Sequence, residues 1–278
     1  MRIFSTVLAL CLLTATDLSA QTLDRIKETG EIRFGYRTDA EPLSYQSENR
    51  PQGYTPKVCF AMAPLIGAQL GMDDMDIVFT PVTTEDRFDQ VASGTIDVLC
   101  GAASVTLTRR EKVDFSIPVF VDGTTVALRA DGPESLQGLA GEKVGVRSGT
   151  TTLEALTNSL SAEGIDAEVI QFDDHPSGIA ALEGGVITAY FADQSIIMSM
   201  VMSNENAADF KVFDQILTIE KHGLALPRGD SDFRLAVDRA LSQLYQDGSM
   251  QQAFEESIPA ADPGLAIRAM FLLAPTLP

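Results

Sequence analysis

Apolar runs of strand length alternate with segments of helical spacing along most of this 278-residue chain. A strand-like run at 31–36 precedes a helical pattern at 56–70 with Pro56 at its first position, and the run "DIVFTPV" follows. Next, "DRFDQVASG" is typical of a short helix that ends at Gly94, and "IDVLCGA" of another strand. Strands that alternate with helices form parallel sheets covered on both faces, so we expect an α/β fold.

A long extended segment at 119–130 separates two α/β sets of similar size. Because no helical pattern interrupts it, we interpret it as a crossover between two lobes, and we expect a second crossover near 217–222. The expected organisation is a first lobe from 21–120, a second lobe from 121–219, and a return to the first lobe at 220–278 that ends in a C-terminal helical tail.

The first twenty residues, "MRIFSTVLALCLLTATDLSA", differ from the rest. One Arg precedes a mostly apolar stretch that is too short to span a membrane, and small residues follow it, which is the pattern of a secretory signal peptide at 1–20. Removal of Cys11 with the signal leaves Cys59 and Cys100. In an oxidising compartment these two predict one disulfide, and two buried free thiols are the alternative.

The net charge of −19 disfavours nucleic acid and anionic lipid as partners. A local arginine cluster can still bind an anionic ligand against this field, because salt screens charges over about 10 Å. The cysteines and histidines lack the spacing of metal ligands, and no nucleotide-binding motif is present. We therefore expect no metal and no cofactor.

Polar side chains follow the expected strands, at the edge where ligands bind in open α/β sheets. In "VTLTRREKV", Thr108 and Glu111 have the spacing of a capping box, and Arg109 lies just inside the helix. There a guanidinium can bind a carboxylate through two hydrogen bonds, and a surface charge is the alternative. In the same way, Thr151 and Glu154 predict a capped helix whose amides can bind an anion.

Asp193 ends the strand-like run "ITAYFAD", as a helix cap or as a partner for an ammonium group. His175 precedes a helix, where a cap or a surface position is the ordinary interpretation. An arginine and helix amides for an anion, together with a carboxylate for a cation, describe the two charges of an α-amino acid.

Five segments resemble the periplasmic solute-binding proteins of polar amino-acid ABC transporters: "GYTPKVCFAMA", "DRFDQVASGTIDVLCGAASVTLTRREKVDFSIPVF", "VGVRSGTTT", "AYFADQSII" and "HGLALPRG". The similarity extends over about 23–254. It implies a two-lobed periplasmic-binding-protein type II fold, with two hinge crossovers and a ligand cleft between the lobes. It also implies a periplasmic protein, expected to be a monomer, that delivers an amino acid to an ABC transporter permease in the inner membrane.

The same resemblance implies roles for individual residues. Arg109 and Ser104 would bind the α-carboxylate from the first lobe, and the amides of Thr150 and Thr151 from the second. Asp193 would bind the ammonium group, with help from carbonyl groups near Ala102.

Within the family, the glutamate/aspartate-binding proteins are the most similar group. That similarity implies side-chain contacts from Arg37, Arg87, Thr84 and His175. Arg37 and Arg87 have an alternative, which is pairing with Asp39 or Asp86. Ala102 departs from the group's pattern, which has a hydroxyl residue there.

The C-terminal segment "PAADPGLAIRAMFLLAPTLP" also departs from the family's pattern. It predicts either an amphipathic helix on the protein's own surface or a segment bound in a groove of another subunit.

An enzyme on the same fold is the competing class, since fold does not determine function. A cyclohexadienyl or arogenate-type dehydratase needs a general acid in the cleft, for which His175, Asp193 and Asp39 are candidates. We expect binding rather than catalysis.

Overall fold

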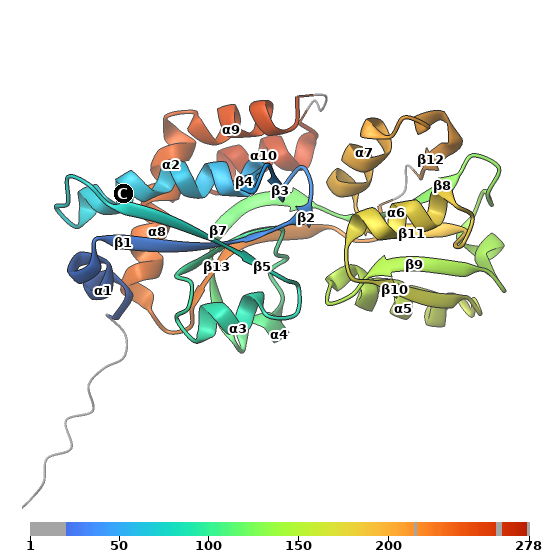
Figure 1. Ribbon diagram of the computed structural model, residues 1–278, viewed down its shortest axis with the longest axis horizontal. Coiled ribbons are helices and arrows are strands. Elements are labelled where there is room, and N and C mark those ends of the chain that lie inside the picture. The colour runs from blue at the N-terminus through green and yellow to red at the C-terminus, as the bar shows by residue number, and fades with distance from the viewer. Residues whose placement is uncertain (1–20, 214–215, 260–262, 277–278) are drawn as a thin grey trace, which may run out of the picture.

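The computed structural model describes residues 21–213, 216–259 and 263–276, and the expected signal peptide at 1–20 lies outside these ranges. Two five-stranded sheets form two lobes, with helices on both faces of the first sheet (Figure 1). The two-lobed α/β architecture predicted from the sequence is confirmed.

The first sheet has the strand order β5-β1-β6-β13-β7. β1 (Glu31–Arg37) is parallel to β5 (Asp76–Val82) and β6 (Val98–Cys100), whereas β13 (Glu220–Pro227) is antiparallel to both β6 and β7 (Val113–Asp122). A small sheet of β2 (Asp39–Ala40), β3 (Ser44–Ser47) and β4 (Arg50–Gln52) adjoins it. The helices of this lobe are α1 (Gln21–Thr29), α2 (Tyr54–Gln69), α3 (Arg87–Ala92), α4 (Leu107–Arg110), α8 (Ser231–Gln246), α9 (Ser249–Ser257) and α10 (Leu265–Leu273).

The second sheet has the order β10-β9-β11-β8-β12. Its strands are β8 (Thr124–Arg129), β9 (Lys143–Arg147), β10 (Glu168–Phe172), β11 (Ala189–Asp193) and β12 (Phe210–Val212). Three α-helices and two 3₁₀ helices accompany them: α5 (Thr151–Glu163), α6 (His175–Glu183), α7 (Gln194–Ser203), η2 (Leu136–Leu139) and η3 (Ala207–Asp209).

Two chain segments connect the lobes. The first passes from β7 to β8 through Gly123, and the second returns through Thr218 into β13. A Cβ atom on Gly123 would lie 2.0 Å from the carbonyl oxygen of Thr218, so the two connections touch where only glycine fits. The predicted lobe boundaries at 120/121 and 219/220 stay a prediction. They propose that the residues of each lobe move together.

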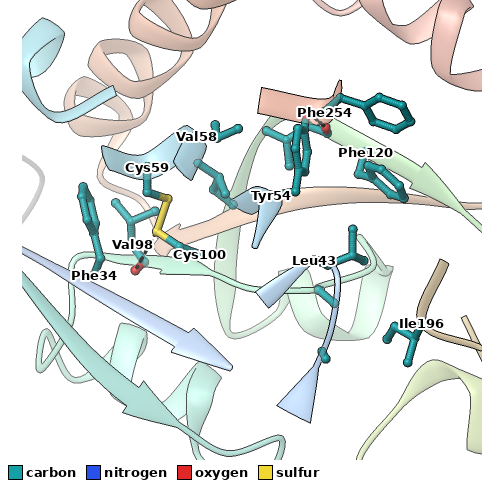
Figure 2. Close-up of a cluster of buried hydrophobic side chains, with 14 of the residues drawn as sticks. Phe34, Leu43, Tyr54, Val58, Cys59, Val98, Cys100, Phe120, Ile196 and Phe254 are labelled. Atoms are coloured by element: carbon teal, nitrogen blue, oxygen red, sulfur yellow. Dashed lines mark hydrogen bonds between the residues drawn. A yellow bond between two sulfur atoms is a disulfide. The ribbon is translucent and has the colours of Figure 1, made fainter. Parts of the chain in front are cut away.

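A disulfide joins Cys59 on α2 to Cys100 at the end of β6 (Figure 2). Both cysteines are fully buried in the core of the first lobe, near Phe34 and Val98. The predicted disulfide is confirmed, and the alternative of two free thiols is wrong.

The C-terminal helix α10 packs on its own chain. Ile267 and Met270 are buried, and the Phe271 ring contacts those of Tyr245 and Phe254. This is the first of the two predicted alternatives for the tail. Among the described helices, none is both long and apolar enough to cross a membrane.

Candidate functional site

A small cavity lies between the two lobes, at the edge where the parallel strands end. Its volume is about 20 Å³, counted as the space that the centre of a water molecule can occupy. Every site residue predicted from the sequence lines this cavity except Thr84, and Thr152 and Ile196 join them. The full lining is Arg37, Arg87, Ala102, Ser104, Arg109, Thr150, Thr151, Thr152, His175, Asp193 and Ile196.

Arg109 lies on the short helix α4, which begins after β6. The Thr106 hydroxyl caps this helix by accepting the amide of Arg109 at 3.1 Å, so the predicted capping box of Thr108 and Glu111 is wrong. The Arg109 Nη1 atom donates to the Ser104 carbonyl at 2.8 Å. Burial lowers the pKa of Arg109, and among the described residues no carboxylate lies within 4.0 Å of it. Arg109 is half-buried and lines the cavity, so it is placed to bind a ligand, and its binding of a carboxylate stays a prediction.

Arg87 begins α3 and is 1% exposed. Its Nη2 atom donates to the Gly149 carbonyl of the other lobe at 3.1 Å, while Nε and Nη1 have no hydrogen-bond partner among the described residues. Burial lowers its pKa, and the charges of Arg37 and Arg109 lower it further. An unpaired buried guanidinium is destabilising, so this arrangement favours an anion beside it.

Arg37 differs from Arg87, although both are almost fully buried. Its Nε and Nη2 atoms contact the same carboxylate oxygen of Asp39, at 2.8 and 2.6 Å. For Arg37 the structure therefore shows the alternative pairing. For Arg87 it does not, because the Asp86 carboxylate accepts bonds from Thr83 and Gln90 instead.

The N-terminus of α5 forms part of the opposite wall. Thr150 caps this helix by accepting the amide of Leu153 at 3.3 Å, so the predicted cap at Thr151 is one residue too late. The Thr151 hydroxyl donates to Glu220 at 2.7 Å and lies 3.1 Å from the Ser104 hydroxyl. The amides in the first turn of a helix have no intrahelical acceptor, which makes this wall a donor surface.

Asp193 ends β11, and its side chain makes no capping hydrogen bond to α7 within the described chain. Asp193 thus occupies the N-cap position of α7, but its side chain does not cap the helix. One oxygen lies 3.6 Å from Nε2 of His222, and the other lies 3.5 Å from the Thr152 hydroxyl. Burial raises the pKa of Asp193, although the charge of His222 acts in the opposite direction.

His175 is the first residue of α6 but does not cap it, since Asp174 does. It is buried, and its Nδ1 atom lies 3.0 Å from the Tyr190 hydroxyl. Burial, reinforced by the charge of Arg37, lowers the pKa of His175 to about 3. The imidazole is therefore neutral at pH 7, and neither ordinary interpretation of this histidine holds.

Two predicted residues contribute no polar side chain to the cavity wall. Thr84 lies beside it, where its hydroxyl donates to Glu85 at 2.6 Å. A Cβ on Gly149 would lie 3.1 Å from the Thr84 Cβ, so Thr84 packs against the turn before α5. Ala102 follows β6 and presents only a methyl group and its backbone.

Sequence reasoning missed three groups of charged residues around the cavity. Glu220 and His222 lie at the start of β13, Asp122 lies at the end of β7, and Arg147 ends β9. The pKa of Asp122 is raised to about 8 by burial and by the charge of Asp193. The signal for Glu220 and His222 was present, because both lie within the expected second crossover at 217–222.

The sequence model for bacterial extracellular solute-binding proteins, family 3, matches residues 32–259. The chain belongs to this family. This solute-binding protein is 26% identical over 261 residues to the L-glutamate/L-aspartate-binding protein of Pseudomonas aeruginosa, which covers 91% of this chain and 86% of that one. It is 25% identical over 245 residues to the glutamate/aspartate import solute-binding protein of Escherichia coli K12, covering 87% of this chain and 81% of that one.

A solved structure with a similar fold is that of an ancestral amino acid-binding protein, described as a precursor of cyclohexadienyl dehydratase. The TM-score is 0.74 at 25% identity, and the match covers 86% of this solute-binding protein and all of that chain.

Proposed function

We propose that this protein binds an acidic L-amino acid, glutamate or aspartate, in the cavity between its lobes. It does so in the periplasm and passes the ligand to an ABC transporter permease. The named glutamate/aspartate-binding relatives support this ligand class. They also support a binding role rather than an enzymatic one.

The observation that carries the proposal is the charge of the cavity wall. Arg87 and Arg109 are both buried or half-buried, and neither has a carboxylate within 4.0 Å among the described residues. Asp193 lies on the same cavity with a raised pKa, so it too lacks full charge compensation. A ligand with two carboxylates and one ammonium group supplies what these three side chains lack.

Each part of such a ligand has partners in this arrangement. Arg109, Ser104 and the amides of Thr150 and Thr151 bind the α-carboxylate, and Asp193 binds the ammonium group with a carbonyl near Ala102. The free Nε and Nη1 atoms of Arg87 bind the side-chain carboxylate, and His175 contacts it as a neutral imidazole. Arginine suits both carboxylates because its planar fork donates two parallel bonds.

A thermal-shift screen of the twenty amino acids, followed by calorimetry on those that stabilise the protein, tests the ligand class. We expect glutamate and aspartate to give the largest shifts, since a ligand at 100 times its Kd adds about 2.7 kcal/mol of stability. Larger shifts with glutamine, arginine or cystine would reject the acidic ligand and keep the amino-acid-binding role.

A dehydratase is the second candidate, because burial raises the pKa of Asp193 as a general acid requires. The ancestral dehydratase precursor among the similar structures also supports it. Incubation with prephenate or arogenate, monitored by product absorbance, separates the two. We expect no turnover, and product formation that Asp193→Asn abolishes would establish the enzyme instead.

A further inference from the structure

A largely buried carboxylate, 11% exposed, joins the two lobes at the edge of the cavity. Asp39 lies in β2 of the first lobe, and its Oδ1 atom is held by Arg37 of the same lobe. Its Oδ2 atom accepts a bond of 3.0 Å from Nε of Arg147, which ends β9 in the second lobe. Each oxygen of this one carboxylate therefore binds one lobe.

Arg147 makes further contacts across the cleft. Its Nη1 atom donates to the Glu85 carboxylate of the first lobe at 3.2 Å, and the neighbouring Ser148 hydroxyl donates to the same oxygen at 3.2 Å. The Arg147 side chain is only 5% exposed. Separation of the lobes would break both of its contacts with carboxylates at once.

Burial alone would raise the pKa of Asp39. The guanidinium groups of Arg37 and Arg147 outweigh this effect and lower the pKa to about 2. Asp39 is therefore ionised at every physiological pH, and its charge is compensated without any ligand. Buried ion pairs with hydrogen-bonded geometry of this kind define one arrangement of the groups that hold them.

We propose that Asp39 and Arg147 form a latch that closes the cleft, and that Asp39 also neutralises Arg37 so that Arg87 alone binds the ligand's side-chain carboxylate. The second half of this proposal rests on the proposed function, and the first half does not. Arg37 lines the cavity, but its charge is already neutralised by Asp39. Arg87, whose Nε and Nη1 atoms have no partner among the described residues, then binds the carboxylate of the ligand's side chain.

The closure role is tested on the protein without ligand, by small-angle X-ray scattering of wild type and Arg147→Gln. We expect the variant to have the larger radius of gyration, because its lobes lose both cross-cleft charge contacts. Lys143→Gln is the matched control, since it removes the same charge from the exposed beginning of the same strand. Identical scattering from Arg147→Gln and wild type would overturn the latch whether or not glutamate is the ligand.

Stopped-flow release of glutamate gives a second measure of closure. We expect Arg147→Gln to release it about tenfold faster, which is about 1.4 kcal/mol, and Lys143→Gln to match wild type. An unchanged release rate in Arg147→Gln contradicts a latch that holds the closed form.

The selectivity role is tested by the ratio of the glutamine Kd to the glutamate Kd. Asp39→Asn frees Arg37 for an anionic side chain, so we expect the ratio to rise about fivefold. The double variant Arg37→Gln/Asp39→Asn removes the pair together and avoids an uncompensated charge if the single variant fails to fold. We expect its ratio to stay within twofold of wild type. A collapse of that ratio would show that Arg37 binds the ligand and that Asp39 does not silence it.

Discussion

The edge of the cleft lowers the pKa of its carboxylate, whereas the hinge raises the pKa of its own. At the edge, Asp39 lies between two guanidinium groups, and its pKa falls to about 2. At the hinge, desolvation and the charge of Asp193 raise the pKa of Asp122 to about 8. Between these regions, Arg87 and Arg109 lack carboxylate partners among the described residues.

The charged side chains therefore fall into two groups. Those at the edge are paired with each other between the lobes, and those at the cavity lack a partner of opposite charge. Compensated charges at the edge stabilise closure without help from a ligand. Unpaired cations and acids around the cavity destabilise the folded protein until a ligand supplies the opposite charges. Loss of an uncompensated charge should therefore weaken ligand binding more than loss of a compensated one.

Removal of Arg109 has the largest expected effect on binding. Arg109→Ala leaves the ligand's α-carboxylate desolvated and unpaired, so we expect binding to weaken by about 2–5 kcal/mol for every amino acid that binds. Calorimetry measures this loss. Arg110→Ala is the matched control, because Arg110 is the exposed neighbour on the same helix and should bind like wild type. Equal losses in the two variants would contradict the assignment of Arg109.

The two cavity arginines allow a direct comparison of a free and a compensated charge. Arg87→Gln should weaken glutamate binding by about 2–3 kcal/mol, the cost of one lost partner of a buried charge, and glutamine binding much less. Arg37→Gln should change the glutamate-to-glutamine preference far less, since Asp39 already neutralises Arg37. Calorimetry with both ligands measures the two preferences, and a larger change in Arg37→Gln would reverse the roles assigned to the pair.

The rule that ligands bind where parallel strands end found most of the cavity wall from the sequence. It located Arg37, Ser104, Arg109, Asp193 and the turn before α5, because each follows a strand of the expected alternation. It could not find Glu220, since β13 is antiparallel to β6 and therefore begins at the edge where β6 ends.

Contacts that depend on how the lobes meet were also beyond local patterns. Asp39 and Arg147 are 108 residues apart, and nothing near either one indicates the other. The predictions of the helix-capping residues were wrong for a different reason. Consecutive hydroxyl residues at 150–152 offer the same capping chemistry, and only the backbone geometry selects Thr150.

The hinge acid Asp122 should destabilise the folded protein at neutral and higher pH. Its pKa is about 8 when folded and about 3.9 in an unfolded chain, so the folded state holds the proton over that interval and stability falls as pH rises through it. Asp122→Asn should therefore raise the free energy of unfolding by about 1–3 kcal/mol at pH 8, and by little near pH 4. The Oδ1 atom of asparagine can accept the two bonds that Oδ1 of Asp122 accepts from the amides of Gly123 and Ser195. Its Nδ2 atom can donate to the Ser195 hydroxyl, which reverses the direction of the third bond.

Denaturant unfolding at pH 4.5, 6 and 8 measures this dependence. Asp131→Asn is the control, because Asp131 is an exposed carboxylate on the surface of the second lobe. The same gain at all three pH values would show that Asp122 is not held protonated by its surroundings.

Substitution of Thr84 has the smallest expected effect on ligand binding. Thr84 lies between the ion pairs at the edge of the cleft and the ligand cavity. Its hydroxyl donates to Glu85, one of the two acids that hold Arg147, and Thr84 is not among the residues lining the cavity. Thr84→Ala should therefore weaken glutamate and glutamine binding equally, by no more than about twofold, because the exposed Glu85 carboxylate keeps its bonds from Arg147 and Ser148. Thr84→Ser keeps the hydroxyl and should restore wild-type affinity. A loss confined to glutamate would instead show that Thr84 reaches the ligand's side chain, as the resemblance to the glutamate/aspartate-binding group implies.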